Sequence, residues 1–211
     1  MGLLSLLSQE PVLFFVLVGA LVFTLSVHEA SHAWVGTLLG DSTAKRMGRL
    51  TLNPLAHLDP IGFLMILFVG FGYAKPVPYN PYNLKYPRWG PALIAAAGPL
   101  SNLIFGSVCA VLYGFMAPSL GSENLLVLTV WFLGRINFTL MAFNLIPLPP
   151  LDGSKALLAM LAGPQHERLR MQIETQGPNI LFFLIIADMF LNIGVFSWIS
   201  RIGDIMFSLL S

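Results

Sequence analysis

Two long stretches of this chain carry no charged side chain, and they limit the folds that the chain can adopt. No charge occurs from residue 11 to residue 27, and none occurs between Arg88 and Glu123. A helix of about 20 apolar residues crosses the ~30 Å hydrocarbon core of a bilayer. Over the whole chain, 56% of the residues are hydrophobic and 10% are charged, whereas a soluble domain has about 25% charged residues. The sequence therefore predicts an integral membrane protein that lies in a lipid bilayer.

The apolar stretches predict an all-α polytopic membrane protein with about four transmembrane helices, in a single domain over residues 1–211. The expected helices cover residues of about 11–39, 91–117, 125–148 and 178–199. The net charge is +1 and no basic patch is present, so we expect no nucleic-acid partner. Cys109, the single cysteine, lies in an apolar run and is expected to be a small packing residue.

Residues 41–90 lack such a span and are expected to form a small membrane re-entrant β region. Residues 61–72 are apolar, but a stretch of twelve residues is too short to cross as a helix. Residues 74–81 contain three prolines, which favour an extended chain or an edge strand. We therefore expect short β-strands that dip toward the functional site and leave one edge free.

The first span contains His28-Glu29-Ala30-Ser31-His32, an acid and two imidazoles in an otherwise apolar run. Residues four apart lie on the same face of a helix, so His28 and His32 can hold one metal ion together. Glu29 can reach water at that metal and act as a general base. A five-residue pattern with three fixed positions also arises by chance. Charged groups at membrane depth cost about 2.5–3.5 kcal/mol each on insertion scales, however, so chance explains this pattern poorly.

A catalytic zinc ion takes three protein ligands and leaves one position open. The other acids and imidazoles expected near the two histidines are His57, Asp59 and Asp152. Asp152 is the preferred third ligand because three prolines in four positions end the third span just before it, at the matching depth. The alternative is that this Asp is a turn residue or the cap of a short helix at residues 154–161.

The basic residues predict how the spans are oriented in the membrane. Nine of the eleven Lys and Arg residues follow the first or the third span, and none lies between the second and the third. The positive-inside rule puts these nine in the cytoplasm and the N-terminus outside. The site at the end of the first span then lies toward the cytoplasm.

Two charged residues, Arg135 and Asp188, lie inside expected spans. At 1.5 Å per residue, both lie roughly 15–18 Å from the cytoplasmic ends of their helices. Consecutive antiparallel spans are usually neighbours, so we expect the two side chains to form an ion pair within the bundle. In the rival arrangement, Arg135 faces a water-filled cleft.

These motifs together resemble those of the site-2 protease family, the intramembrane zinc metalloproteases, in a short form without PDZ or CBS domains. The resemblance rests on residues 28–32 followed by Asn144-Leu-Ile-Pro-Leu-Pro-Pro-Leu-Asp152-Gly153. Residues 48–54, 57–60 and 98–102 are also similar to short bacterial and archaeal members. The similarity covers about residues 10–200.

The resemblance implies a role for each residue that matches. The implied metal ligands are His28, His32 and Asp152, for one Zn²⁺ per chain, and Glu29 is the implied catalytic base. Substrate contacts are expected from three amide side chains: Asn144, Asn102 and Asn53. Two further residues are accessory candidates, with a structural role as the alternative: His57 and Asp59.

The implied function is that of a zinc-dependent intramembrane endopeptidase, which cuts peptide bonds in or near transmembrane segments of membrane-protein substrates. The expected setting is regulated intramembrane proteolysis in a prokaryotic cell membrane. Two other classes of protein share the pattern: a membrane protein of the same fold that binds substrate without cutting it, and a metal transporter. The intact Glu29 argues against the first, and the scarcity of His and Asp within the spans argues against the second.

Overall fold

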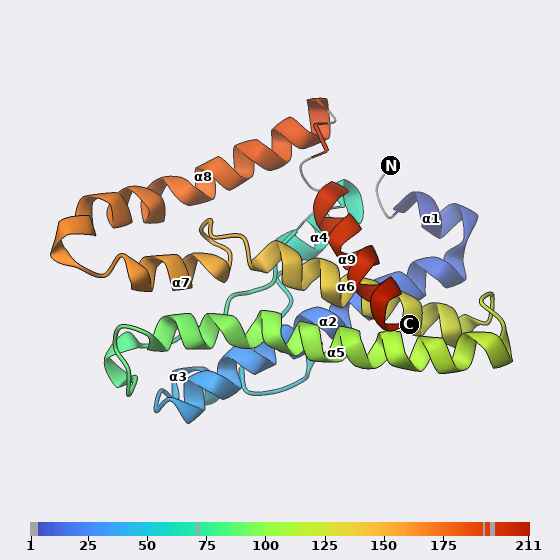
Figure 1. Cartoon of the computed structure of the whole chain (residues 1–211), viewed down its shortest axis with the longest axis horizontal. Coiled ribbons are helices and arrows are strands. Elements are labelled where there is room, and N and C mark those ends of the chain that lie inside the picture. Colours follow the sequence, from blue (N-terminus) through green and yellow to red (C-terminus); the bar gives the residue numbers. More distant parts are fainter. Residues whose placement is uncertain (1–3, 71, 192, 195–196) are drawn as a thin grey trace.

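The computed structural model describes residues 4–70, 72–191, 193–194 and 197–211, and its regular elements are helices (Figure 1). No β-sheet occurs among these residues. In chain order, the elements are α1 Leu4–Gln9, α2 Pro11–Leu38, α3 Thr43–Arg46, η1 Pro54–Ala56, α4 Pro60–Val69, η2 Pro81–Asn83, α5 Gly90–Leu120, α6 Leu125–Asn144, α7 Gly153–Met160, η3 Pro164–His166, α8 Glu167–Leu191 and α9 Ser197–Leu210.

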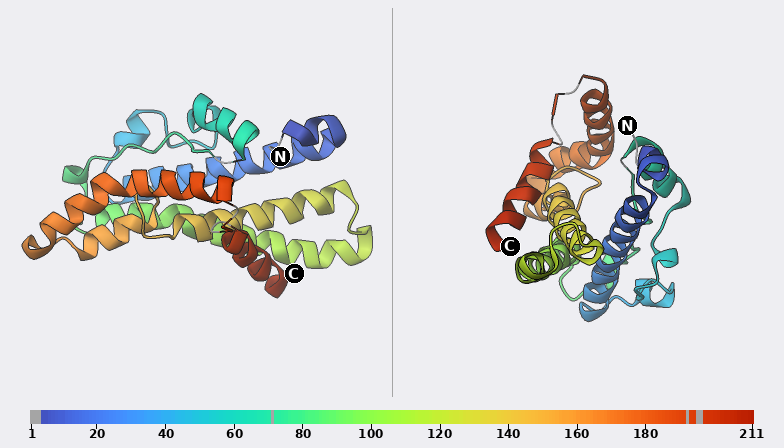
Figure 2. Two further views of the ribbon diagram at one scale, coloured as in Figure 1. Left: turned by 90° about the horizontal axis from the view of Figure 1, so that it is seen from above. Right: turned by 90° about the vertical axis from the view of Figure 1, so that its right-hand side faces the viewer.

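Three long helices, α2, α5 and α6, form the body of the molecule. They lie along its long axis, and each runs antiparallel to the next in sequence (Figure 1, Figure 2). They have 28, 31 and 20 residues and are the described helices that are long and apolar enough to cross a membrane. The first three predicted spans, at about 11–39, 91–117 and 125–148, are therefore confirmed as helices with nearly the predicted limits.

The local sequence explains where these helices begin and end. Asn124 caps α6, because its side chain accepts a hydrogen bond from the Leu126 N–H at 2.9 Å. After α2 and α5 the chain turns at Gly40 and Gly121, whose φ angles of 104° and 83° suit glycine. Pro99, which the sequence suggests as a kink or an interruption, lies inside α5, and the helix continues through it.

The predicted fourth span, at about 178–199, is wrong in its limits. α8 begins at Glu167 and ends at Leu191, and its first half carries charged side chains, so it is not among the helices long and apolar enough to cross. Beyond it, Gly194 has a φ angle of 75°, and a separate helix, α9, begins at Ser197. Residues 192 and 195–196 of the predicted span lie outside the described residues.

The expected re-entrant β region at 41–90 is not confirmed, because its described residues form the short helices α3, η1, α4 and η2 instead. The strand-like pairing among them is one isolated antiparallel bridge between Leu58 and Ala74. The prolines at 76, 78 and 81 lack the N–H that a strand ladder needs. α4 is too short to cross, as predicted, since its ten residues rise about 15 Å. Residue 71 lies outside the described part of this region.

α9 packs across α5 and α6, where Figure 1 shows it crossing the bundle. One face of α9 is buried, and it contains Ile199, Gly203 and Phe207. Phe207 forms a buried cluster with Ala110 of α5 and Phe138 of α6. The spacing of four residues along α9 puts all three buried side chains on one stripe.

Arg135 of α6 takes its carboxylate partner from α9. Its Nε and Nη2 atoms donate to Asp204 Oδ1, and its guanidinium carbon lies 4.3 Å from the centre of the Trp131 ring. The predicted pair of Arg135 with Asp188 is therefore wrong. The reason is that α9, which was not expected as a separate helix, places Asp204 beside α6.

A buried carboxylate ties the end of α2 to the loop that precedes α5. Asp41 accepts hydrogen bonds from the Asn80 N–H at 2.7 Å, from Asn83 Nδ2 at 2.9 Å and from the Thr43 hydroxyl at 2.6 Å. The Thr43 N–H also donates to it at 3.1 Å. These bonds fix residues 80–83 against the end of the helix that contains His28.

Replacing Asp41 with Asn should destabilise the fold in a pH-dependent manner. Burial alone would raise the pKa of Asp41, but its hydrogen bonds lower it to about 2. The carboxylate therefore stabilises the fold fully above its unfolded pKa of about 3.9, and this contribution is lost as the pH falls through about 2. At pH 7 we expect Asp41→Asn to lower the unfolding midpoint in detergent by about 4–8 °C, or about 2 kcal/mol.

The difference in unfolding midpoint between wild type and Asp41→Asn should disappear between about pH 4 and pH 2. Glu123→Gln, which changes an exposed carboxylate, is the matched control and should leave the midpoint unchanged. A gap that stays constant down to about pH 2 would contradict the role of the Asp41 carboxylate.

Candidate metal centre

α2 brings two histidines and a glutamate together inside the bundle. His28, Glu29 and His32 are all buried, and their potential ligand atoms lie within 4.8 Å of one another. The spacing of four residues puts the two imidazoles on one face of α2, with ring centres 4.6 Å apart. The structure thus puts the His-Glu-x-x-His motif on a helix, where its three polar side chains converge.

α5 holds each imidazole through its Nδ1 atom. His32 Nδ1 lies 2.7 Å from the carbonyl oxygen of Ile94. A carbonyl oxygen can only accept, so Nδ1 carries the proton and Nε2 of the neutral ring presents a lone pair. His28 Nδ1 lies 3.0 Å from the fully buried side-chain amide of Asn102. Asn102 therefore contacts a histidine, and its predicted role toward substrate stays a prediction.

Asp152 faces the same two rings from the segment that leads into α7. Its Oδ2 atom lies 3.2 Å from His28 Nε2 and 3.4 Å from His32 Nε2. Asp152 occupies the N-cap position of α7, but its side chain makes no capping hydrogen bond. Oδ2 is buried and has no hydrogen-bond partner among the described residues. The carboxylate is therefore directed at the histidines and not at the start of α7.

The spacing of these donor atoms fits a zinc ion. Ligands about 2.0–2.1 Å from a tetrahedral zinc lie roughly 3.3–3.4 Å apart. The observed separations of 3.2 Å and 3.4 Å between Asp152 Oδ2 and the two Nε2 atoms agree with that value. Imidazole nitrogen and carboxylate oxygen are also the donors found in His–carboxylate zinc sites.

Gly98 of α5 allows the helix to approach both rings. A Cβ atom at this position would lie 2.6 Å from His28 Nε2 and 2.6 Å from His32 Cε1, closer than real Cβ contacts allow. Residue 98 belongs to the stretch 98–102 that is similar to a family motif. The close approach explains why a glycine is required at this point, since any side chain would fill the space next to the ligand atoms.

Arg49 lies close to the site, and the sequence analysis did not select it. It is buried, and its Nη2 atom donates to the carbonyl oxygens of Lys75 and Pro76. Burial lowers the pKa of Arg49, whereas the Glu29 carboxylate acts in the opposite direction. The guanidinium is therefore within electrostatic reach of Glu29. The available signal was its position in residues 48–54, which resemble a family motif.

Four other candidate residues have local partners. Asn53 and Asp59 are the side-chain N-caps of η1 and α4. His57 is fully buried, with Nε2 2.8 Å from the carbonyl oxygen of Thr51. Asn144 donates from Nδ2 to a carbonyl oxygen one turn earlier in α6, at 3.1 Å. These contacts agree with the structural alternative for His57 and Asp59, and the roles of Asn53 and Asn144 toward substrate stay predictions.

Comparisons with known proteins point to the same chemistry. The model of peptidase family M50 matches residues 117–187. "Putative zinc metalloprotease YwhC" of Bacillus subtilis is 40% identical over 182 residues, which cover 82% of this chain and 81% of YwhC. "Putative zinc metalloprotease Rip2" of Mycolicibacterium smegmatis is 27% identical over 180 residues, which cover 82% of this chain and 68% of Rip2. No solved structure matches the chain.

A bundle of membrane-spanning length with two histidines and a carboxylate facing one another defines the class of membrane-embedded zinc metalloproteases. The chain belongs to peptidase family M50, the site-2 protease family, and it is an integral membrane protein. The resemblance seen in the sequence is therefore confirmed.

Replacing Asn102 with Leu should weaken zinc binding without removing a ligand. The buried amide fixes the orientation of the His28 ring, and loss of such a contact typically lowers metal affinity 10–100-fold. Zinc retained per chain, measured against a graded chelator, is the readout. Ser101→Ala is the matched control, because the Ser101 hydroxyl donates to the backbone carbonyl oxygen of Gly98 and not to a histidine. This variant should keep the zinc affinity of wild type. Equal zinc affinity in Asn102→Leu and wild type would rule out this orienting role.

Proposed function

We propose that this chain is a zinc-dependent intramembrane endopeptidase that hydrolyses peptide bonds in or near transmembrane segments of its protein substrates, in regulated intramembrane proteolysis. The observation that carries the proposal is the position of Asp152 Oδ2, 3.2 Å and 3.4 Å from the Nε2 atoms of His28 and His32. These three side chains would hold one zinc ion per chain. Membership of peptidase family M50 supports this assignment.

The bound zinc would act as a Lewis acid that polarises the scissile carbonyl and makes water more acidic. Glu29 belongs to the same cluster of donor atoms. It takes a proton from the attacking water and returns it to the leaving amine. Burial of Glu29 and the two histidines limits the access of bulk water to the reacting atoms. The nearby Arg49 guanidinium offsets the negative charge of Glu29.

The substrate must present an extended backbone to this site. A transmembrane helix satisfies its peptide groups internally, so attack requires local unwinding, and unpaired groups are costly in lipid. Residues 49–53 and 74–80 form no helix, and their one strand-like pairing is the isolated bridge between Leu58 and Ala74. The Arg49 side chain connects the two segments, because it donates a hydrogen bond to the Lys75 carbonyl oxygen. Their backbone groups, together with the Asn144 side chain, are the proposed partners of the unwound substrate.

The proposed orientation follows from the distribution of basic residues. α3, the start of α5 and α7 lie at one end of the bundle (Figure 1). Lys45 lies in α3, Arg88 just before α5 and Lys155 in α7. By the positive-inside rule this end faces the cytoplasm of a prokaryotic cell, and the N-terminus lies outside. The metal site, close to the end of α2, then lies toward the cytoplasmic side.

Glu29→Gln should separate catalysis from metal binding. All three proposed ligands remain, so the variant should retain about one zinc per chain. Cleavage of a membrane-spanning reporter in detergent should fall by 10²-fold or more, the usual effect of losing a general base. Asp152→Asn should lose zinc as well as cleavage, and Glu123→Gln is the control that should keep both. Elemental analysis and gel assays of the same preparations provide the two measurements.

The same assays decide between classes of protein. Wild type that binds no zinc, or Glu29→Gln that cuts as fast as wild type, would contradict the proposed mechanism. Zinc binding without cleavage would favour a substrate-binding protein of the same fold. Movement of zinc into sealed vesicles would favour a transporter.

Substrates with helix-weakening residues near the scissile bond should be cut faster than matched substrates without them. Gly and Pro lower the free energy needed to unwind a helix, and unwinding has to precede attack. A reporter series in which Gly or Pro is replaced by Leu should therefore show slower cleavage by wild type. Equal rates across the series would contradict the requirement for unwinding, but they would not affect the proposed zinc mechanism.

A further inference from the structure

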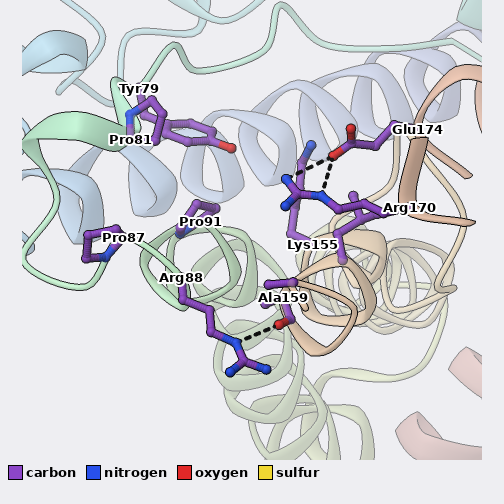
Figure 3. A pocket seen from close by; sticks show the side chains of 11 residues that line it. Tyr79, Pro81, Pro87, Arg88, Pro91, Lys155, Ala159, Arg170 and Glu174 are labelled. Atoms are coloured by element: carbon purple, nitrogen blue, oxygen red, sulfur yellow. Dashed lines mark hydrogen bonds and ion pairs between the residues drawn. The ribbon is translucent and has the colours of Figure 1, made fainter. Parts of the chain in front are cut away.

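A polar cavity lies at the end of the bundle where α7 and the start of α5 meet. Its volume is about 200 Å³, and its lining comes from the loop before α5, from the first turn of α5, from α7 and from the first half of α8 (Figure 3). No proposed metal-site residue lines it. The volume is below the ~300–1,000 Å³ of pockets that enclose a drug-sized ligand. It therefore suits a small polar group.

The lining of this cavity is strongly positive for this chain. It contains three basic side chains, Arg88, Lys155 and Arg170, and one acidic side chain, Glu174. Its net charge is therefore +2, whereas the whole chain of 211 residues has a net charge of +1. This local excess of positive charge makes an anion the expected occupant.

Two of the basic groups are available to such an anion. Arg88 is already engaged, since its Nε donates to the Ala159 carbonyl oxygen at the end of α7 at 3.0 Å. The Arg170 guanidinium is 3.4 Å from a Glu174 carboxylate oxygen, an exposed pair of the kind that contributes little. The Lys155 ammonium has no hydrogen-bond or ion-pair partner among the described residues.

A hydroxyl group completes the set of donors. Figure 3 shows the Tyr79 hydroxyl pointing across the cavity toward Lys155 and Arg170. Burial and the nearby Glu174 carboxylate raise the pKa of Tyr79, while Arg170 opposes them. The phenol therefore keeps its proton at neutral pH and can donate it. An ammonium, a guanidinium and a phenol thus face one space from three different segments of the chain.

We propose that this cavity is a binding site for a phosphate group, held by Lys155, Arg170 and the Tyr79 hydroxyl. A phosphate oxyanion accepts several hydrogen bonds at once, and Arg and Lys are its usual partners. The cavity adjoins Pro91 in the first turn of α5, where the chain enters its apolar span. With α5 as a membrane span, this position corresponds to the lipid head groups, where basic pockets bind anionic lipids. A free phosphate-bearing solute offers the same chemistry.

Occupancy of the cavity would brace the segment that carries Asp152. Lys155 lies in the first turn of α7, and its backbone N–H donates to the backbone carbonyl oxygen of Asp152 at 2.9 Å. A phosphate that bridges Lys155 of α7 and Arg170 of α8 would restrain α7 from its exposed side. The binding itself does not depend on peptidase activity and is measured without it.

The test uses the purified full chain in detergent, with thermal unfolding as the readout. The probes are phosphatidylglycerol in mixed micelles, phosphatidylcholine as the zwitterionic comparison, and inorganic phosphate against chloride at equal ionic strength. Lys155→Gln and Arg170→Gln should each weaken the stabilising effect of the phosphate probe about fivefold in apparent affinity, the factor expected for one basic residue near anionic lipid. Lys155→Arg should retain it.

Two further variants distinguish charge from structure. Glu174→Gln removes the same ion pair as Arg170→Gln but makes the cavity more positive, so it should strengthen binding. Arg168→Gln removes an equal charge from an exposed position of α8 outside the cavity and should have no effect.

The two probes identify the source of the phosphate. Stabilisation by phosphatidylglycerol but not by inorganic phosphate supports a lipid head group, and stabilisation by inorganic phosphate supports a soluble ligand. The proposal is overturned if neither probe stabilises wild type. It is also overturned if Arg168→Gln weakens binding as much as Lys155→Gln, or if Glu174→Gln weakens it as Arg170→Gln does.

Discussion

The Asp152 carboxylate and the imidazoles of His28 and His32 are stable together in an apolar environment only when a proton or a metal cation lies between them. Asp152 Oδ2 lies 3.2 Å and 3.4 Å from the two Nε2 atoms, in a bundle of apolar helices. Water cannot solvate them freely there, and isolated buried charges are unfavourable by many kcal/mol. The helices around the site hold these three groups together, as the proposed zinc site requires.

α5 provides most of that support, although it contributes no ligand. It orients one ring through the Ile94 carbonyl and the other through the Asn102 amide, and Gly98 between them leaves the space that both rings need. The three positions are four residues apart, so they lie on one face of the helix. This arrangement also explains why α5 must pass Pro99 as a continuous helix, since a break there would misalign the supports on either side.

The sequence predicted those features that depend on local pattern, and it failed where the outcome depends on tertiary contacts. Apolar stretches located α2, α5 and α6 to within a few residues, and the four-residue spacing placed the two histidines on one face of a helix. The β region was mispredicted, because prolines mark a loop but do not say whether two segments will pair. α9 was missed because the apolar run was read as continuing past Leu191. Its stripe of Ile199, Gly203 and Phe207 is a helical pattern that was available.

Polar side chains inside the bundle pair across helices, and the unexpected partner of Arg135 is one example. Within this bundle, Asn137 of α6 donates to the Thr24 hydroxyl of α2 at 2.9 Å, and Arg135 donates to Asp204 of α9. Each pair joins two helices through a donor on one helix and an acceptor on the other. Asp152 differs, because the groups that it faces are imidazoles, which balance its charge only when they are protonated or share a cation with it. Whether a charged residue beside an apolar span marks a functional site therefore depends on its neighbours, and sequence alone does not reveal those neighbours.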